Sequence, residues 1–400
     1  MKFVIICKEK KVKGPVNIQG RITDKGIVFF EMNMRFTGIT GNRAQLGFNE
    51  VDFLVDNFLG LQGKLNGYAK NKLGVWQVAC TTISRIKIKE KAKNTLTVLG
   101  AGGNIGSFFI HELIKENNFH CINMICRESS YHKYQSMFLF DGINITKDTD
   151  QIAQSVYSQS DVLVNFVGAL AHKPDKEKYD AIIFQYEQLQ KIIKANIPLV
   201  INVSTQSVYD QTLDLEKDEN AEIMINNLYA FQKYLTENFY KSINFFSPST
   251  KVVSLRFSRV IGTYFTNEKP KGFFANVIDA VINDENIEIP NPENKINLID
   301  IRDVISAILF IINKTNWESL PKILNVGGTN LSIKQYCDHV IETLGLLSKK
   351  HFINFADNSD VKISSMIDSS LFKKFNWSPE FTIEETIKHI EAGINKELTL

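Results

Sequence analysis

Leu99-Gly-Ala-Gly-Gly-Asn-Ile-Gly106 is the stretch of sequence that decides the fold. It follows a short apolar run, 96–99, and enters a segment, 105–115, whose apolar residues recur at helical spacing. A strand-to-helix turn that binds a dinucleotide needs glycine for its tight bend, for close approach of the backbone to pyrophosphate, and for helix packing. Three glycines in the spacing Gly-x-x-Gly-x-x-Gly meet these needs, and the amino end of the helix favours phosphate. The expected cofactor contacts at this turn are Gly100, Gly103, Asn104, Ile105 and Gly106.

The pattern around this turn predicts an α/β fold. Short apolar runs that predict buried strands alternate with amphipathic stretches that predict helices, which is typical of a doubly wound, Rossmann-type parallel sheet with helices on both faces. The predicted strands are 96–99, 121–126, 162–166, 199–203 and 252–257. The predicted helices are 105–115, 180–195, 228–241, 273–282, 302–312, 332–344 and 382–391.

The same pattern divides the chain into segments. Residues 1–83 form a separate small α+β module, and 84–94 form a basic linker. Residues 95–265 are the expected dinucleotide-binding domain. Residues 266–400 are expected to form a smaller substrate lobe over the carboxyl ends of the strands, with some strands and helices returning to the core of the first domain.

Composition narrows the function classes. The chain has 400 residues, of which 44% are hydrophobic, and its 46 basic and 44 acidic residues leave a net charge of +2. The net charge therefore produces no strong electrostatic field that would favour nucleic acid or a membrane surface as a partner. The five cysteines are scattered, without the spacing of a zinc site or a disulfide scaffold, and no apolar stretch reaches membrane-spanning length. We expect a cytoplasmic protein with reduced thiols.

Tyr229 and Lys233 stand four residues apart in a predicted helix, so they lie on one helix face. A tyrosine with its free pKa near ~10 is a poor base at neutral pH, and a neighbouring ammonium favours its ionised form. Thr205 follows the predicted strand 199–203, at the carboxyl end of the sheet. These three side chains are the expected catalytic group.

These motifs together resemble the extended short-chain dehydrogenase/reductases, which include the NAD-dependent epimerase/dehydratase family. The resemblance covers residues 95–394. It implies that Tyr229 is the acid/base, that Lys233 binds the nicotinamide ribose and depresses the Tyr pKa, and that Thr205 holds the reacting oxygen. It also implies a sugar substrate, nucleotide-activated in many members, a place in surface-polysaccharide precursor synthesis, and a homodimer formed through two helices. Its motifs, beside the glycine turn, are Asn165-Phe-Val-Gly-Ala169, Ser204-Thr-Gln-Ser-Val-Tyr209, Tyr229-x-x-x-Lys233, Leu255-Arg-Phe-Ser-Arg-Val-Ile-Gly262, Ile299-Asp-Ile-Arg-Asp303, Leu324-Asn-Val-Gly-Gly328 and Asn376-Trp-Ser-Pro379.

The residues after the second predicted strand bear on cofactor choice. Where an acidic residue would bind the ribose 2′-hydroxyl, the chain has Arg127, which favours the 2′-phosphate of NADP, and then Glu128, which keeps NAD open. Val167 and Gly168 are expected to line the cofactor. Asn165 lies with them, but packing and lining the site are equally good readings of this residue.

Departures from the family pattern restrict the reaction and the substrate. Gln206-Ser207 stand where the 4,6-dehydratases carry Asp-Glu, so dehydration is not expected, while keto-sugar reduction and epimerisation both stay open. Arg259 replaces an Asn of many nucleotide-sugar enzymes. Ile296 replaces their diphosphate-binding Arg, for which the adjacent Lys295 is the candidate substitute. The expected substrate contacts are Thr205, Gln206, Tyr209, Arg259 and Lys295, with Tyr209 equally well explained by packing.

The amino-terminal module resembles the last portion of ATP-grasp ligases. Gln19, Glu31 and Asn33 match the residues that hold the magnesium of ATP there, and their oxygen atoms suit a hard cation. The lysines and adenine pocket of a whole ligase have no counterpart in residues 1–83. Two readings follow, a vestigial half-domain or a split ligase that a partner chain completes, with the reductase-like region as its fused partner.

Overall fold

The computed structural model describes residues 17–23, 26–33, 51, 54–55 and most of 95–395. The gaps in the last range are 117–118, 120, 139–141, 264–269, 271, 315 and 357–361. The chain divides into two units, Met1–Lys91 and Ala92–Leu400. The predicted linker 84–94 and the ATP-grasp-like pattern at 34–38 and 46–50 lie outside the described residues.

The described part of the first unit is mainly an antiparallel hairpin of β1 (Asn17–Thr23) and β2 (Gly26–Asn33). Gln19 pairs with Glu31 across the hairpin, and the Nδ2 of Asn33 donates a hydrogen bond to the Oε1 of Glu31 at 2.6 Å. Paired residues of a hairpin share a face, as do alternate residues of a strand, so the three predicted metal ligands lie on one face. Their role in metal binding stays a prediction.

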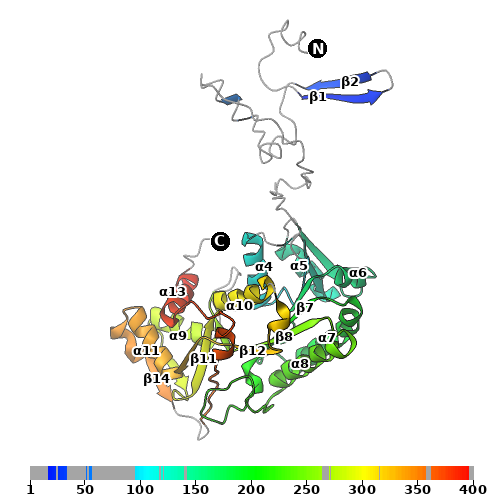
Figure 1. The fold of residues 1–400 in the computed structure, drawn as a ribbon. Helices are drawn as coiled ribbons and strands as arrows, with labels where there is room; N and C mark the ends of the chain where they lie inside the picture. Colours follow the sequence, from blue (N-terminus) through cyan, green and yellow to red (C-terminus); the bar gives the residue numbers. More distant parts are fainter. Residues whose placement is uncertain are drawn as a thin grey trace. The chain divides into compact units, whose positions relative to one another are not determined.

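The second unit is built on a seven-stranded parallel sheet of order β12-β8-β7-β6-β3-β4-β5, which confirms the predicted α/β fold (Figure 1). The chain enters at β3 in the interior, adds β4 and β5 on one side, and then adds the other strands on the opposite side. The order reverses between β3 and β6, where doubly wound sheets bind ligands. The strands are β3 (Thr95–Leu99), β4 (Cys121–Cys126), β5 (Ile143–Lys147), β6 (Val162–Asn165), β7 (Leu199–Thr205), β8 (Lys251–Phe257) and β12 (Ile323–Val326).

All five predicted strands are present, and the two strands at the sheet edges were not predicted. In β5, only Thr146 is buried. β5 is covered less completely than the interior strands, so it lacks the continuous apolar run that marks a strand buried on both faces.

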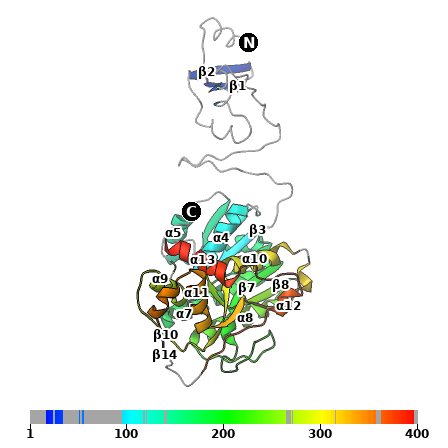
Figure 2. The ribbon, with the colours of Figure 1, turned by 90° about the vertical axis from the view of Figure 1, so that its left-hand side faces the viewer.

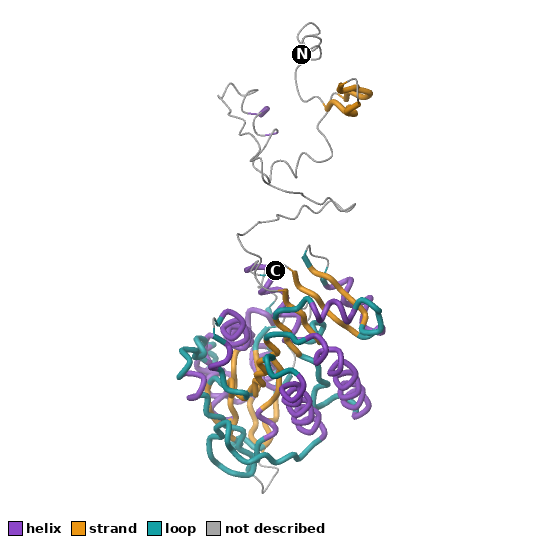
Figure 3. The backbone as a smooth tube through the Cα atoms, turned by 45° about the vertical axis from the view of Figure 1, so that its right-hand side comes forward, coloured by secondary structure: helices purple, strands orange, loops and turns teal. Residues whose placement is uncertain are grey.

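Helices cover both faces of the sheet (Figure 2, Figure 3). Alternate strand residues enter different cores: Leu96 and Val98 pack in one cluster with Phe109 and Ile308, whereas Leu99 packs in the other. The first cluster belongs to α4 (Asn104–Glu116), α5 (Glu128–Met137) and α10 (Ile301–Asn313). The second belongs to α6 (Ala153–Ser158), α7 (Asp175–Ala195) and α8 (Leu228–Phe246).

The later elements form a smaller lobe with its own hydrophobic core. It contains a three-stranded sheet of order β13-β11-β9 and a parallel pair of β10 and β14. α10, β12 and α12 (Ser370–Lys373) return to the large sheet. The lobe elements are β9 (Arg259–Ile261), α9 (Phe273–Ile282), β10 (Ile287–Pro290), β11 (Lys295–Asp300), β13 (Thr329–Ser332), α11 (Ile333–Thr343), β14 (Ile353–Ala356) and α13 (Ile383–Ile394).

Candidate active site

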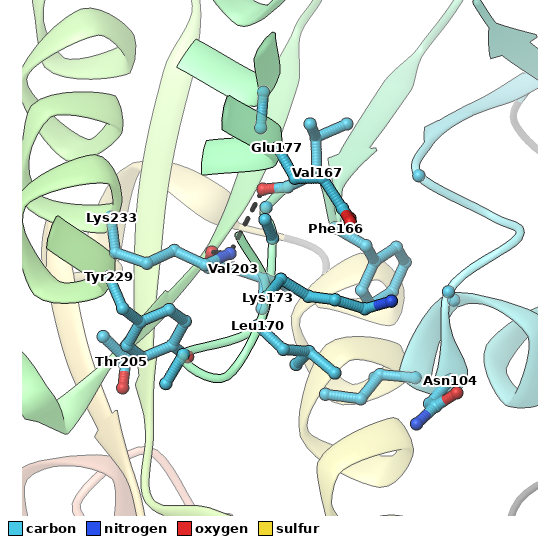
Figure 4. A pocket seen from close by; sticks show the side chains of 18 of the residues that line it. Asn104, Phe166, Val167, Leu170, Lys173, Glu177, Val203, Thr205, Tyr229 and Lys233 are labelled. Atoms are coloured by element: carbon cyan, nitrogen blue, oxygen red, sulfur yellow. Dashed lines mark hydrogen bonds between the residues drawn. The ribbon is translucent and has the colours of Figure 1, made fainter. Parts of the chain in front are cut away.

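A cavity of about 960 Å³ lies at the carboxyl ends of β3, β4, β6 and β7 and reaches β8 and β9. Its wall includes the glycine turn, the segment after β6, the end of β7 and the start of α8. Most of the predicted site residues therefore share one space. Figure 4 shows this space from close by, with Tyr229, Thr205 and Lys233 in its wall.

The glycine turn fits a dinucleotide. Gly100 has a φ of 76°, and a Cβ there would lie 2.8 Å from the backbone nitrogen of Val167. A Cβ on Gly106 would lie 2.5 Å from the carbonyl oxygen of Gly100. Neither position tolerates a side chain, so the turn stays tight and α4 begins at Asn104 with its free backbone N–H groups beside the cavity.

Basic groups gather where the adenine ribose of a dinucleotide would lie. Arg127 is exposed at the end of β4, and Lys133 on α5 donates a hydrogen bond to the carbonyl of Gly102 at 3.1 Å. Glu128 does not line the cavity and forms an ion pair with Lys147 at 2.5 Å. Lys133 was missed from the sequence, because α5, the helix that carries it, is not among the predicted helices.

Asn165 is fully buried and shapes the wall without lining it. Its Nδ2 donates to the Oε1 of Gln185 at 2.7 Å and to the Oδ1 of Asn202 at 2.9 Å, while its Oδ1 accepts from the N–H of Val167 at 3.1 Å. Packing is therefore what the structure shows for this side chain. It fixes the segment that places Val167 and Gly168 in the cavity wall.

Tyr229 lies in the first turn of α8, directly after an N-cap in which Asn227 accepts from the N–H of Ala230 at 2.8 Å. Burial raises the pKa of Tyr229, while a hydrogen bond with the Thr205 side chain and the charge of Arg259 act to lower it. The expectation of a depressed Tyr pKa is thus not met in this structure, because burial prevails. The cation that acts on the phenol is Arg259.

Lys233 is held by two backbone carbonyls. Its Nζ donates to the oxygen of Val203 at 3.0 Å and to that of Val167 at 3.2 Å (Figure 4). Burial lowers the pKa of Lys233 to about 8, and the carboxylate of Glu237 opposes this shift. The ammonium is therefore fixed between β7 and the segment after β6, both of which line the cavity.

Of the other predicted substrate contacts, some line the cavity and some do not. Gln206 and Arg259 line the cavity with Thr205. Tyr209 is buried outside the lining, and its hydroxyl donates to the Oδ1 of Asn325 at 2.7 Å. Lys295 also lies outside the lining, in an ion pair with Asp214 at 2.7 Å. These two residues are not brought to the cavity.

The cavity is more cationic than the chain as a whole. Five Lys or Arg residues line it, against one carboxylate, that of Glu177. Lys173, in the segment between β6 and α7, was missed from the sequence because nothing in its local pattern shows that this segment lies over the cavity. Figure 4 shows its side chain extending into the space. The five basic residues are Arg127, Lys133, Lys173, Lys233 and Arg259.

In the part of the chain that the structure describes, no helix combines the length and apolar character needed to cross a bilayer.

Comparison with known proteins places this geometry among related folds. Residues 96–327 match the model of the NAD dependent epimerase/dehydratase family. A search of the curated proteins finds no match. Among solved structures, a UDP-glucuronic acid 4-epimerase from Bacillus cereus is 18% identical with a TM-score of 0.63, over 76% of this chain and 100% of that one.

Two other solved structures are similar to the same extent. A UDP-glucose 4-epimerase from Thermotoga maritima is 18% identical with a TM-score of 0.61, over 76% of this chain and 99% of that one. A dTDP-glucose 4,6-dehydratase from Bacillus anthracis is 18% identical with a TM-score of 0.63, over 76% of this chain and 97% of that one. At this identity the likeness supports the fold alone.

Proposed function

Because the chain belongs to the NAD-dependent epimerase/dehydratase family, we propose that it is an oxidoreductase or epimerase that acts on a nucleotide-activated sugar. One observation carries the proposal. Tyr229 and Thr205 line the same cavity as the glycine turn, so a proton-transfer group and a dinucleotide site open onto the same space.

The side chains suggest how the reaction proceeds. A bound nicotinamide would supply or accept hydride at a sugar carbon. Thr205 holds the hydroxyl or carbonyl oxygen on that carbon by a hydrogen bond, and the Oη of Tyr229 takes or returns its proton. Arg259 favours the phenolate during this transfer, since its charge lowers the pKa of Tyr229. Lys233 contacts the ribose next to the nicotinamide.

NADP is the cofactor that the charges favour. A 2′-phosphate on the adenine ribose would meet Arg127 and Lys133, and no carboxylate lines that part of the cavity. Glu128 is engaged by Lys147, which reduces its ability to accept hydrogen bonds from the two ribose hydroxyls of NAD. The NAD bound in several solved neighbours is evidence about those proteins.

The lining also favours reduction or epimerisation over 4,6-dehydration. Elimination of water needs an acid and a base beside the reacting pair. Gln206 and Ser207, which follow Thr205, carry no ionisable group, and the one carboxylate that lines the cavity belongs to α7. The excess of basic residues suits the diphosphate of a nucleotide sugar, with Arg259 as a contact near the reacting end.

Two measurements on the purified protein test this proposal. Mass spectrometry after denaturation identifies any dinucleotide that copurifies, and assays with a panel of uridine- and thymidine-diphosphate sugars follow the product by chromatography. A retained dinucleotide with sugar isomers as products indicates epimerisation, and stoichiometric consumption of free NADPH indicates reduction. Failure of every dinucleotide to bind would contradict the proposal.

The helices beside the cavity support a homodimer. α7 exposes Tyr179, Ile183 and Tyr186, which lie on one helix face at spacings of four and three residues, and α8, packed beside α7, exposes Phe231. Contiguous apolar surface of this kind is typical of an interface.

Ile183→Asp is expected to convert a dimer into a monomer, since it places a charge in the interface. Light scattering measures the mass. Ile152→Asp, at an equally exposed apolar position before α6, should leave the mass unchanged, and a monomeric wild type would exclude the dimer.

The amino-terminal unit is expected to be dispensable for this chemistry. Every residue that lines the cavity belongs to the second unit, so deletion of residues 1–92 should leave kcat within about 2-fold. Within the first unit, Gln19, Glu31 and Asn33 match metal ligands, but the sequence has no recognisable counterpart of the lysines and adenine pocket that a whole ATP-grasp ligase uses in phosphoryl transfer. We therefore expect no ATP turnover by the whole chain. Steady ATP hydrolysis that is lost in Glu31→Ala would favour the split-ligase reading instead.

A further inference from the structure

One buried charge cluster adjoins the cavity, which its Ser204 lines, and its ion pair has no part in the mechanism above. It consists of Glu237 on α8, Arg256 on β8 and Ser204 on β7, all of them buried. Arg256 binds Glu237 through both nitrogens that face it, Nε to Oε1 at 3.0 Å and the terminal nitrogen to Oε2 at 2.7 Å. The hydroxyl of Ser204 donates to the same Oε1 at 2.5 Å.

This arrangement fixes the carboxylate in one orientation. Two bonds from a planar guanidinium and a third from a hydroxyl leave Glu237 little rotational freedom. Arg256 is fixed in turn, because its guanidinium lies 4.8 Å from the ring centroid of Tyr209. Although burial lowers the pKa of Arg256, the Glu237 carboxylate raises it above its usual value, so Arg256 stays charged.

Glu237 stands four residues after Lys233 on α8, on the helix face that also carries Tyr229. The two side chains are also anchored on neighbouring residues of β7, Lys233 on the carbonyl of Val203 and Glu237 on the hydroxyl of Ser204. Thr205 is the next residue. The cluster is therefore adjacent to the predicted catalytic residues both on α8 and on β7.

Lys233 needs a nearby negative charge. Its ammonium is buried and has two neutral carbonyls as its hydrogen-bond acceptors, and burial favours loss of its proton. Around it, β7 and the segment after β6 present no ionisable side chain at these contacts. α8 presents Tyr229 and Glu237, β8 presents Arg256 beyond Glu237, and β9 presents Arg259 beyond Tyr229. Glu237 is the carboxylate among these groups.

We propose that Glu237 is a positioning residue of the catalytic site, which keeps the Lys233 ammonium charged at the end of β7 and is itself oriented by Arg256 and Ser204. The proposal assigns a functional role to an ion pair that would otherwise be a packing feature, since a buried pair is weak evidence for stability. It rests on the proposed function for its activity readout only.

The direct test is an NMR titration of lysine labelled with ¹³C at Cε, in the protein without cofactor or substrate. The Lys233 resonance is assigned by its absence in Lys233→Arg. In Glu237→Gln, the pKa of Lys233 is expected to fall by about 1 unit or more, because the opposite charge four residues further along α8 is removed. Arg256→Gln removes a positive charge from the same cluster, so the pKa of Lys233 should rise or stay unchanged.

These opposite signs separate electrostatics from structural damage, which would affect both variants alike. Glu237→Asp retains the negative charge, so its Lys233 pKa should lie close to the wild-type value. If Glu237→Gln does not fold, Glu237→Gln/Arg256→Gln leaves no unpaired buried charge, and its Lys233 pKa should lie below that of Arg256→Gln alone. The proposal is overturned if folded Glu237→Gln has the Lys233 pKa of the wild type. It is also overturned if the Lys233 pKa falls as much in Arg256→Gln as in Glu237→Gln.

Activity supplies the second readout. If the reaction needs charged Lys233, the alkaline limb of kcat/KM should move to lower pH in Glu237→Gln by the same amount as the NMR pKa. A shifted NMR pKa with no turnover on any sugar would leave the positioning of Lys233 intact and contradict the proposed reaction. A shifted NMR pKa with an unshifted pH profile would show that the charge of Lys233 has no part in turnover and would overturn the catalytic role of Glu237.

Discussion

Tyr229→Phe is expected to lower kcat by about 10²-fold or more, because general acid–base catalysis by a positioned side chain contributes at least this much. The phenol lines the cavity together with Thr205, and the charge of Arg259 acts to lower its pKa. Phenylalanine keeps the ring and its packing, so the Kd for the dinucleotide should change by less than about 3-fold. Steady-state turnover and fluorescence titration of NADPH measure the two effects separately.

Two further observations sharpen this prediction. Burial raises the pKa of Tyr229, so the wild-type rate should still be rising with pH above neutrality if the phenolate is the reactive form. Arg259→Gln removes a charge that lowers this pKa, and its rising limb should move to higher pH. Near-normal turnover in Tyr229→Phe would show that the proton is moved by another group.

Arg127→Asp is expected to weaken NADP binding by at least about 10²-fold. A hydrogen bond to a charged group contributes about 1.5–3 kcal/mol, roughly 10- to 150-fold in Kd, and repulsion between the new carboxylate and the 2′-phosphate adds to the loss. NAD has no 2′-phosphate, so its affinity should change by less than about 5-fold. Calorimetric titration of both cofactors against both proteins measures the difference.

A charge reversal away from the cavity controls for net charge. Lys241→Asp on α8 changes the protein by the same two units at an exposed position outside the lining, and it should leave both Kd values unchanged. If the wild type binds NAD more tightly than NADP, then Arg127 does not recognise a 2′-phosphate and the predicted preference for NADP is wrong.

The sequence predicts the sheet and the reacting end of the cavity because both depend on local patterns. Gly100 and Gly106 stand where a strand-to-helix turn leaves no room for a Cβ, and the Tyr229–Lys233 spacing places both residues on one helix face whatever surrounds them. Helix and strand positions follow from apolar periodicity for the same reason.

The rest of the site depends on long-range packing, which local patterns do not contain. Lys173 lines the cavity because its loop passes beside it. Lys295 lies outside the lining and forms an ion pair with Asp214, which is 81 residues earlier in the chain. The influence of Arg259 on Tyr229 depends on where the chain passes from β8 of the large sheet into β9 of the three-stranded sheet. Motif spacing predicts Tyr229 and Lys233 as a pair, but not the charges that act on them.

The most direct test of the account is transfer of deuterium from NADPH labelled at the nicotinamide C4 to the carbonyl carbon of a nucleotide keto-sugar, which both a reductase and the second half-reaction of an epimerase would perform, followed by mass spectrometry of the sugar. The wild type is expected to place the label on a sugar carbon. In Tyr229→Phe, the rate of labelling should fall by about 10²-fold or more. Absence of label from every uridine- and thymidine-diphosphate sugar tested, with NADPH bound, would contradict the central claim, as would labelling that continues unchanged in Tyr229→Phe.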